Sequence, residues 1–273
     1  FADSTGTQDA TAAIQEAMDD HENGNRIIYL PNGTYLVSNT VKWPPSNETS
    51  CGTCQKRTCL SGQSRAGTVI RLEDNCGGFQ DPQNPRGVLW TGVRPAQRFR
   101  NGIRNLTVNT GRGNSGACGI QYNTSNQGSM RGVRIVSEDR AGVAGLDVGF
   151  TDEIGPGYVY DLEVIGFDYG IRASLLNSLT LNKIVLRDQR VCGISNSRHV
   201  ISIQDLTVSG PVTAVENKGV MMLLGAGLTG SGPASQAAAI ENDGTLYARA
   251  ITTRGYAGAI DNKSGDAADV AGP

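Results

Sequence analysis

Three acidic residues occupy the same place in a repeated pattern near the end of the chain. Glu216, Glu241 and Asp261 each follow an aliphatic residue and precede an asparagine. If the aliphatic side chain of a strand points inward, the next side chain points outward. Stacked strands would place the three carboxylates in one outward row, about 5 Å apart on neighbouring strands and ~10 Å apart on alternate strands. Carboxyl pairs at such spacings cleave glycosidic bonds, and crowding raises the pKa of one carboxyl, as a general acid requires.

The same row continues toward the start of the chain with Gln121, Asp147, Arg172 and Ser195. Asp147 and Arg172 would lie on neighbouring strands, where we expect an ordinary surface ion pair worth about 0–1 kcal/mol. Both are candidates for substrate binding. Two other interpretations of the acidic row remain open: it is a solvated, chemically idle face, or it binds Ca²⁺, because hard cations prefer clustered carboxylates. No other cofactor is expected.

A second outward row is mostly uncharged. It contains Thr107, Arg134, Glu163, Val185, Thr207, Thr229 and Thr252. Arg134 and Glu163 are adjacent in this row, so we expect an ion pair, and these two residues complete the candidate substrate-binding set. Two longer loops, residues 109–116 and 149–157, are further candidates, because long loops on a rigid scaffold often carry function.

Both rows depend on an internal repeat of about 22 residues. Each copy has a longer segment centred on an aliphatic residue and a shorter segment in which Gly or Ala precedes an aliphatic residue, most often Ile. The central aliphatic residues are Leu106, Val133, Leu162, Ile184, Leu206, Leu228 and Ile251, and those of the shorter segments are Ile120, Leu146, Ile171, Ile194, Val215, Ile240 and Ile260. One copy cannot bury its apolar face alone, whereas stacked copies can. The repeat therefore predicts an all-β fold, a parallel β-solenoid.

Two further positions of the repeat indicate how each coil turns. The residue before the central aliphatic residue is Asn105, Gly132, Asp161, Lys183, Asp205, Gly227 or Ala250. Most of these types tolerate the left-handed conformation that a bend between two strands needs, although Lys183 and Ala250 fit it less well. After the shorter segment an asparagine recurs, at Asn123, Asn196, Asn217, Asn242 and Asn262. We expect these amides to stack as a hydrogen-bonded ladder.

The composition agrees with thin repeated turns and excludes several classes of protein. The 273 residues include 36 Gly but only 5 Phe, 2 Trp and 8 Tyr. No Gly-x-y period is present, so the chain is not collagen. The longest apolar runs are far shorter than the ~20 residues of a membrane helix. With 24 Lys and Arg against 26 Asp and Glu, no basic field attracts nucleic acid. Neither a membrane nor a nucleic acid is therefore an expected partner.

The start of the chain differs from the repeats. Residues at helical spacing form one apolar face: Ala10, Ala13, Ile14, Ala17 and Met18. We expect a helix that Asp9 caps and Gly24 ends. Residues 26–30 and 34–38 then read as two strands around a tight turn.

The six cysteines divide into a cluster of four and two isolated residues. Cys51, Cys54, Cys59 and Cys76 lie in a polar segment, residues 43–78, which reads as an insertion stapled by disulfides. A zinc site of four thiolates or free thiols are the alternatives.

Cys118 and Cys192 share one position of the repeat, three coils apart. That separation of ~14 Å is too long for a disulfide. We therefore expect two inert thiols in the core.

The first residues resemble the pectate-lyase superfamily of right-handed β-helix proteins. The stretch from Phe1 to Ala17, with its Ala-Ile-Gln-Glu-Ala, is similar to the end of the opening motif of that superfamily. Residues 30–38 are similar to its next signature, Pro-x-Gly-x-Tyr after a strand. The chain departs from the pattern at residues 3–6, Asp-Ser-Thr-Gly, where Gly-Asp-Gly is usual, and in its cysteine-rich segment. The resemblance implies a right-handed parallel β-helix with a short N-terminal capping helix. The superfamily includes polysaccharide lyases, glycoside hydrolases, epimerases and phage tailspikes, so the fold alone does not give the activity.

We expect one elongated domain over residues 1–273, with a cap at 1–42, the cysteine-rich insertion at 43–78 and the coils at 99–262. The chain reads as part of a longer, processed protein. The expected function is that of a secreted or cell-surface protein acting on polysaccharide, a glycoside hydrolase with Glu216, Glu241 and Asp261 as acid and base. The alternatives are a polysaccharide lyase and a non-catalytic carbohydrate-binding or tailspike-like scaffold. The scarcity of aromatic residues favours the scaffold.

Overall fold

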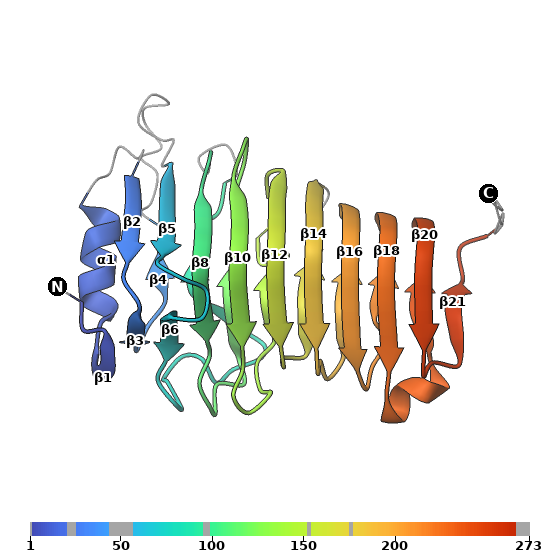
Figure 1. The fold of residues 1–273 in the computed structure, drawn as a ribbon, viewed down its shortest axis with the longest axis horizontal. Coiled ribbons are helices and arrows are strands. Elements are labelled where there is room, and N and C mark those ends of the chain that lie inside the picture. Colours follow the sequence, from blue (N-terminus) through green and yellow to red (C-terminus); the bar gives the residue numbers. More distant parts are fainter. Residues whose placement is uncertain are drawn as a thin grey trace.

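The computed structural model describes residues 2–20, 26–43, 57–94, 99–151, 154–174 and 177–265. The chain winds as a right-handed parallel β-helix, which confirms the expected fold class, and helix α1 lies at its N-terminal end (Figure 1). Its strands form a 12-stranded sheet, called sheet A below, and a 9-stranded sheet, called sheet B. None of the helices in the described residues is long and apolar enough to cross a membrane.

From β7 onward the strands alternate between the two sheets along the chain. Sheet A contains β1 (Thr5–Asp9), β2 (Arg26–Leu30), β3 (Gly33–Val37), β5 (Thr58–Gly62), β6 (Thr68–Leu72), β8 (Gly102–Asn109), β10 (Ser129–Val136), β12 (Gly157–Ile165), β14 (Ser178–Arg187), β16 (Val200–Gly210), β18 (Val220–Gly230) and β20 (Thr245–Arg254). Sheet B contains β4 (Val41–Lys42), β7 (Arg86–Trp90), β9 (Ala117–Gln121), β11 (Ala144–Asp147), β13 (Tyr169–Ala173), β15 (Cys192–Asn196), β17 (Val215–Asn217), β19 (Ala238–Asn242) and β21 (Gly258–Asn262). Helix α1 (Thr11–Asp19) follows β1, and a short 3₁₀ helix (Gly232–Gln236) lies between β18 and β19.

The predicted register of sheet B is confirmed along the whole repeat. The aligned residues on consecutive strands are Ile120, Leu146, Ile171, Ile194, Val215, Ile240 and Ile260. From Ile120 to Ile240 these side chains are completely buried, whereas Ile260 on β21 is 45% exposed. The apolar face of each short strand therefore builds one continuous core.

In sheet A the predicted register holds as far as Leu206 and is wrong in the next coil. Ala226, not Leu228, lies opposite Leu206. The bend moves with it, because Gly225 has φ 71° and is the left-handed residue that the sequence pattern assigns to Gly227. Gly227 accordingly takes the outward position expected for Thr229. The repeat pattern misaligns this coil by two residues.

Lys183 and Ala250 adopt the left-handed bend although their side chains do not favour it. Both have φ 58°. The strand of Lys183, β14, is paired on both flanks with β12 and β16, and that of Ala250, β20, is paired with β18, so the register of the neighbouring strands holds both residues in the bend. The position in the coil therefore decides the conformation, and the residue type only sets its cost.

The glycine of the Gly-Ile segments has a steric cause. A Cβ added to Gly119 would lie 2.1 Å from the side chain of Ile135, and one added to Gly145 would lie 2.2 Å from Val164. Ile135 and Val164 lie near the ends of sheet A strands. The motif thus marks the corner at which the two sheets approach each other most closely.

An amide ladder joins the last coils, as predicted. Asn196 Nδ2 donates to Asn217 Oδ1 at 2.9 Å, and the next two steps, to Asn242 and then to Asn262, are both 2.7 Å. Asn123 is not part of the ladder, because its Oδ1 accepts a hydrogen bond from the backbone N–H of Gly155. The prediction is therefore confirmed for the four later asparagines and wrong for Asn123.

The N-terminal cap differs from its expected form in two details. Ala10, rather than Asp9, is the N-cap of α1, although Asp9 Oδ1 still accepts a hydrogen bond from the N–H of Thr11 at 2.8 Å. The strands β2 and β3 do not pair with each other: β2 pairs with β5, and β3 pairs with β1 and β6. They are successive strands of sheet A.

The segment 43–78 is not simply an inserted loop. It supplies β5 and β6, which both pair with β8. Cys59 and Cys76 are free thiols, so no disulfide supports the stapled insertion at these residues. Cys51 and Cys54 lie outside the described residues.

The two isolated cysteines share one register column, as predicted. Cys118 and Cys192 are separated by three strand steps, through Ala144 and Tyr169. Both are free and completely buried, and burial raises the pKa of each thiol well above its usual value. Neither cysteine belongs to the main core cluster, and Cys118 packs with Val143 and Ala144 in a small separate cluster.

Candidate functional site

The outward row of sheet B begins with a closed group of polar side chains. Gln121, Asp147 and Arg172 are aligned on β9, β11 and β13. Arg172 donates to Asp147 through two nitrogens, with Nε–Oδ1 3.1 Å and Nη2–Oδ2 2.7 Å. The carboxylate also accepts hydrogen bonds from Gln121 Nε2 at 3.4 Å and from the backbone N–H of Gly149 at 2.9 Å. Both of its oxygens are thereby occupied.

The burial of Asp147 corrects the expected surface ion pair. The Asp147 side chain is 0% exposed and that of Arg172 is 29% exposed. Gln121 is itself fixed by the start of β7 and the residue before it, since it accepts from the N–H of Gly87 and donates to the carbonyl of Pro85. Removing one partner of such a pair leaves an uncompensated buried charge. Asp147 is thus enclosed rather than open to a substrate.

Farther along the same row, the three acidic residues lie together as the register predicts. Glu216, Glu241 and Asp261 are aligned on β17, β19 and β21. The two glutamates are partly buried, whereas Asp261 is exposed. With Lys218 and Lys263, the glutamates line a cavity of about 220 Å³. This cavity is the candidate site.

The two glutamates of the cavity are chemically unequal. Glu216 makes no hydrogen bond or ion pair with the described residues, and burial followed by repulsion from Glu241 raises its pKa. Glu241 has a cationic partner, because its Oε2 lies 3.3 Å from Lys263 Nζ. Glu216 is therefore the carboxyl that keeps its proton more readily than usual, and Glu241 is the one paired with a cation. Such a division is what acid and base roles require.

Lys263 lies where a cation bound to the acidic row would have to sit. Its Nζ is 3.3 Å from Glu241 Oε2 and 3.6 Å from Asp261 Oδ2. In the described part of the chain, no group of three His, Cys, Asp or Glu side chains could hold a metal ion.

Arg134 and Glu163 form an ion pair, as predicted. The pair lies on sheet A, whereas the cavity lies on sheet B. Arg134 Nε is 3.3 Å from Glu163 Oε2, and Arg187 Nη1 is 3.4 Å from Glu163 Oε1. These strands, β10, β12 and β14, belong to sheet A. The pair is therefore separate from the cavity of Glu216 and Glu241.

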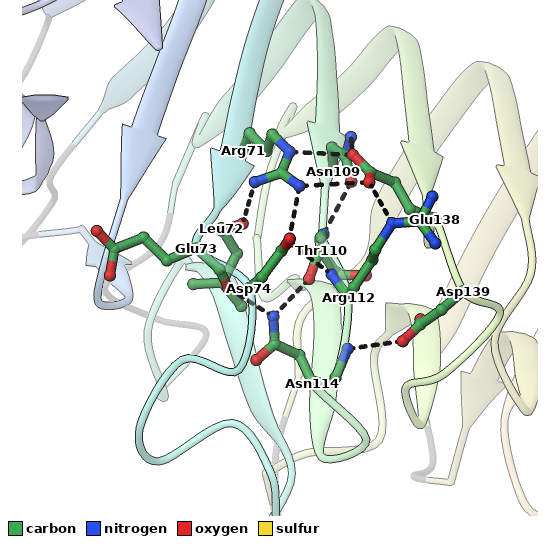
Figure 2. A network of polar contacts seen from close by, with 12 residues as sticks. Arg71, Leu72, Glu73, Asp74, Asn109, Thr110, Arg112, Asn114, Glu138 and Asp139 are labelled. Atoms are coloured by element: carbon green, nitrogen blue, oxygen red, sulfur yellow. Dashed lines mark hydrogen bonds and ion pairs between the residues drawn. The ribbon is translucent and has the colours of Figure 1, made fainter. Parts of the chain in front are cut away.

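The long loop 109–116 is anchored by a polar network (Figure 2). Arg71 donates to Glu138 from Nε at 3.0 Å and from Nη2 at 3.3 Å. Two residues of the loop reach the same carboxylate: Asn109 Nδ2 donates at 2.7 Å, and Arg112 Nε lies at 3.3 Å. Three consecutive coils are thereby tied together at the ends of β6, β8 and β10.

This network makes Glu138 a poor proton donor. Hydrogen bonds from Arg71 hold the pKa of Glu138 below its usual value, in contrast to that of Glu216. Asp74 also bonds Arg71 Nη2, at 2.7 Å. The loop 109–116 is therefore a structural tie, and the second long loop, 149–157, is described only in part.

The sequence reasoning misses the two lysines of the cavity. Lys218 and Lys263 each stand two positions after an acidic residue of the row, in Glu216-Asn217-Lys218 and Asp261-Asn262-Lys263. That recurrence is the signal that could have found them. Tyr169 is also missed: its pKa is raised by burial and by the charge of Glu216, but its neighbours come from other coils, and no local pattern marks it.

Comparison with known proteins places these observations in a family. Residues 2–220 match the family model of rhamnogalacturonase A/epimerase, pectate lyase-like proteins. The match includes Glu216, whereas Glu241 and Asp261 lie beyond it. No curated protein matches the chain.

Solved structures are similar in fold at low sequence identity. A "1,3-alpha-1,4-beta-D-galactose-4-sulfate-3,6-anhydro-D-galactose-2-sulfate 4 galactohydrolase" aligns with a TM-score of 0.52 and 15% identity, over 88% of this chain and 57% of its own. The A-module of the Azotobacter vinelandii mannuronan C-5 epimerase AlgE4 gives 0.40 and 14%, over 96% of both chains. The phiAB6 tailspike, in complex with oligosaccharides of Acinetobacter baumannii surface polysaccharide, gives 0.47 and 13%, over 92% of this chain and 46% of its own. This chain spans little more than half of the galactohydrolase.

Proposed function

Because the chain belongs to the rhamnogalacturonase A/epimerase, pectate lyase-like family, we propose that it is a carbohydrate-active protein of the cell exterior and that it cleaves polysaccharide as a glycoside hydrolase. The name of the family and the galactohydrolase of similar fold support the substrate class. The reaction would take place at the cavity of Glu216 and Glu241 on sheet B.

The observation that carries this proposal is the unequal pair of glutamates. Glu216 has a raised pKa and no bonded partner among the described residues, so it is suited to protonate the oxygen of the departing sugar. Glu241, paired with Lys263, is suited to attack or stabilise the sugar carbon. Glu216 then takes a proton from water, whose oxygen bonds to the sugar carbon as its bond to Glu241 breaks, and this restores both carboxyl groups.

The strand spacing favours retention of configuration at the sugar. Glu216 and Glu241 are directly opposite on neighbouring strands, which are about 4.8 Å apart. Retaining hydrolases hold their carboxyl groups ~5–5.5 Å apart, whereas inverting enzymes need ~6.5–9.5 Å. The pair Glu216 and Asp261, two strands apart, would suit inversion instead. Proton NMR of the anomer released first distinguishes the two pairs.

The activity is tested on a panel of neutral and acidic polysaccharides, with two signals recorded together. A hydrolase releases reducing ends without the absorbance of unsaturated uronides. A lyase gives both signals, and a non-catalytic scaffold gives neither. Reducing ends alone support the proposal, and either of the other results overturns it.

The roles are tested by Glu216→Gln and Glu241→Gln. Each is expected to lower kcat by about 10²–10⁴-fold, because each removes a group that transfers a proton or contacts the reacting carbon. Ser195→Ala is the matched control, since Ser195 lies in the same row one strand before Glu216 and carries no charge. Unchanged turnover in both glutamine variants would remove these residues from the mechanism.

A further inference from the structure

The outer face of sheet A carries a row of polar and aromatic side chains that the proposed site does not use. Five residues are directly opposite one another on consecutive strands from β8 to β16: Arg104, Arg131, Tyr160, Asn182 and Gln204. We call them the sheet A row. Arg104, Arg131, Tyr160 and Gln204 are exposed, and Asn182 is partly exposed. The row runs along the solenoid axis, at right angles to the strands.

Aromatic rings stand at the centre of the sheet A row. Tyr158 and Tyr160 lie two residues apart on β12, with ring centroids 6.4 Å apart and planes inclined by only 17°. Arg131 lies over the ring of Tyr158, with its guanidinium carbon 5.5 Å from the centroid. Tyr160 is 39% exposed. Lys183 Nζ lies 5.9 Å from the centroid of the Tyr160 ring, and the exposed part of the ring offers an apolar surface to a sugar.

The charge at one end of the sheet A row is not balanced by the described residues. Arg104 and Arg131 form no ion pair with them, although the two are directly opposite across β8 and β10. The nearby carboxylate of Asp161 is already shared by Arg65 and Lys183, each at 3.2 Å. Like charges opposite each other destabilise a sheet. Arg131 has the ring of Tyr158 as a partner, but neither arginine has a counter-charge among the described residues, and an anion bound between them would relieve their repulsion.

The far end of the sheet A row is polar and uncharged. Asn182 Nδ2 donates to Gln204 Oε1 at 3.3 Å, and both amides keep groups free for hydroxyl partners. The next register row contains Tyr158 and, four strands on, the 52% exposed Tyr247. Planar guanidinium groups match carboxylates, tyrosine rings match sugar faces, and amides match hydroxyls. A carboxylated polysaccharide presents all three of these partners: carboxylates, sugar faces and hydroxyl groups.

We propose that the sheet A row is a binding surface for a linear carboxylated polysaccharide, with a carboxylate on Arg104 and Arg131 and a sugar ring on Tyr160. The chain of the ligand would run along the solenoid axis, one strand spacing after another. The surface is on a different sheet from the cavity of Glu216 and Glu241, and it binds whether or not that cavity is catalytic. It would hold the protein on a polymer while other parts of the polymer reach sheet B.

The test measures binding of polygalacturonate by affinity electrophoresis and titration calorimetry, with fully methyl-esterified polygalacturonate as the neutral probe. The double variant Arg104→Gln with Arg131→Gln is expected to weaken binding of polygalacturonate by at least about tenfold. Tyr160→Ala is expected to weaken it about three- to tenfold, and Tyr160→Phe to preserve it, because the ring remains. The esterified probe should bind the native protein more weakly than polygalacturonate does.

Three controls keep the proposal separate from the proposed function. Arg249→Gln changes an exposed arginine in the same register row at its other end, and it should leave affinity unchanged. Glu216→Gln should leave the contribution of the sheet A row to polygalacturonate affinity unchanged, even if it abolishes cleavage. All the substituted side chains are exposed or partly buried, and the melting temperature of each variant shows that it is folded.

Two results would overturn the proposal. One is polygalacturonate binding that is absent or unaffected by the arginine and tyrosine variants. The other is equal binding of single-stranded DNA with the same dependence on Arg104 and Arg131 and none on Tyr160, which would assign the surface to polyanions in general.

Discussion

Asp147 and Glu216 occupy the same register position of sheet B, three strands apart, yet their surroundings are opposite. Asp147 is completely buried and is held by two nitrogens of Arg172. Glu216 is partly exposed and has no bonded partner among the described residues. The coil gives both carboxylates the same backbone position, but their neighbours in the row differ: Gln121 and Arg172 flank Asp147, whereas Ser195 and Glu241 flank Glu216. In a solenoid, the repeat thus sets where a side chain stands, and the residue types on the adjacent strands decide what it can do.

The largest effect is expected from breaking the buried ion pair of Asp147 and Arg172. Asp147→Asn leaves the guanidinium of Arg172 largely buried without its counter-charge, and we expect the free energy of unfolding to fall by about 3 kcal/mol. Urea denaturation measures this. Glu216→Gln, at the equivalent position, should change stability by less than about 0.5 kcal/mol near pH 5. An equal loss of unfolding free energy in the two variants would contradict the distinction between the enclosed Asp147 and the open Glu216.

A second effect is expected at Lys263, the cation beside the cavity of Glu216 and Glu241. Lys263→Met removes the partner of Glu241, and the activity should fall by less than about tenfold, because this exposed ion pair contributes only ~0–1 kcal/mol. The positive charge of Lys263 also lowers the pKa of Glu216. Its loss should therefore move the alkaline limb of the pH–rate profile to higher pH. A limb that stays in place would mean that Glu216 is not the proton donor.

The smallest effect is a difference in the pH dependence of stability. Burial and Glu241 raise the pKa of Glu216 in the folded state above the 4.5 expected for an unfolded chain. The unfolded state then releases this proton first, so Glu216 costs stability as pH rises from about 4.5 through its folded pKa. Glu216→Gln should remove this cost, and its advantage over the native protein should grow across that window. Denaturation at several pH values measures it, with Ser195→Ala as a reference that should show no such trend.

The fold was largely predictable because its signal is local and repeated. The Gly-Ile segments align correctly over seven strands, since each places an aliphatic residue at a corner that the two sheets share. The register fails after Leu206, where the run Val220–Leu224 is apolar throughout and hides the alternation that marks the inner face.

The candidate site was predictable only in part. The alignment of Glu216, Glu241 and Asp261 follows from the register, and their roles remain a prediction. The burial of Asp147 could not be foreseen, because its enclosure depends on Gln121 and on segments distant in the sequence, such as the one before β7. Long-range packing of this kind leaves no trace in the spacing of residues.

The asparagine ladder gives the later coils an electrical direction. All three steps have the same sense, because the N–H group of each asparagine from Asn196 to Asn242 donates to the carbonyl of the asparagine in the following coil. The amide dipoles are therefore parallel, and hydrogen bonds in such a row strengthen one another through polarisation. Reversing one amide would face two carbonyls against each other on one side and two N–H groups on the other. The row can consequently be extended only in the same sense, which gives the stacked coils a polarity like that of a helix.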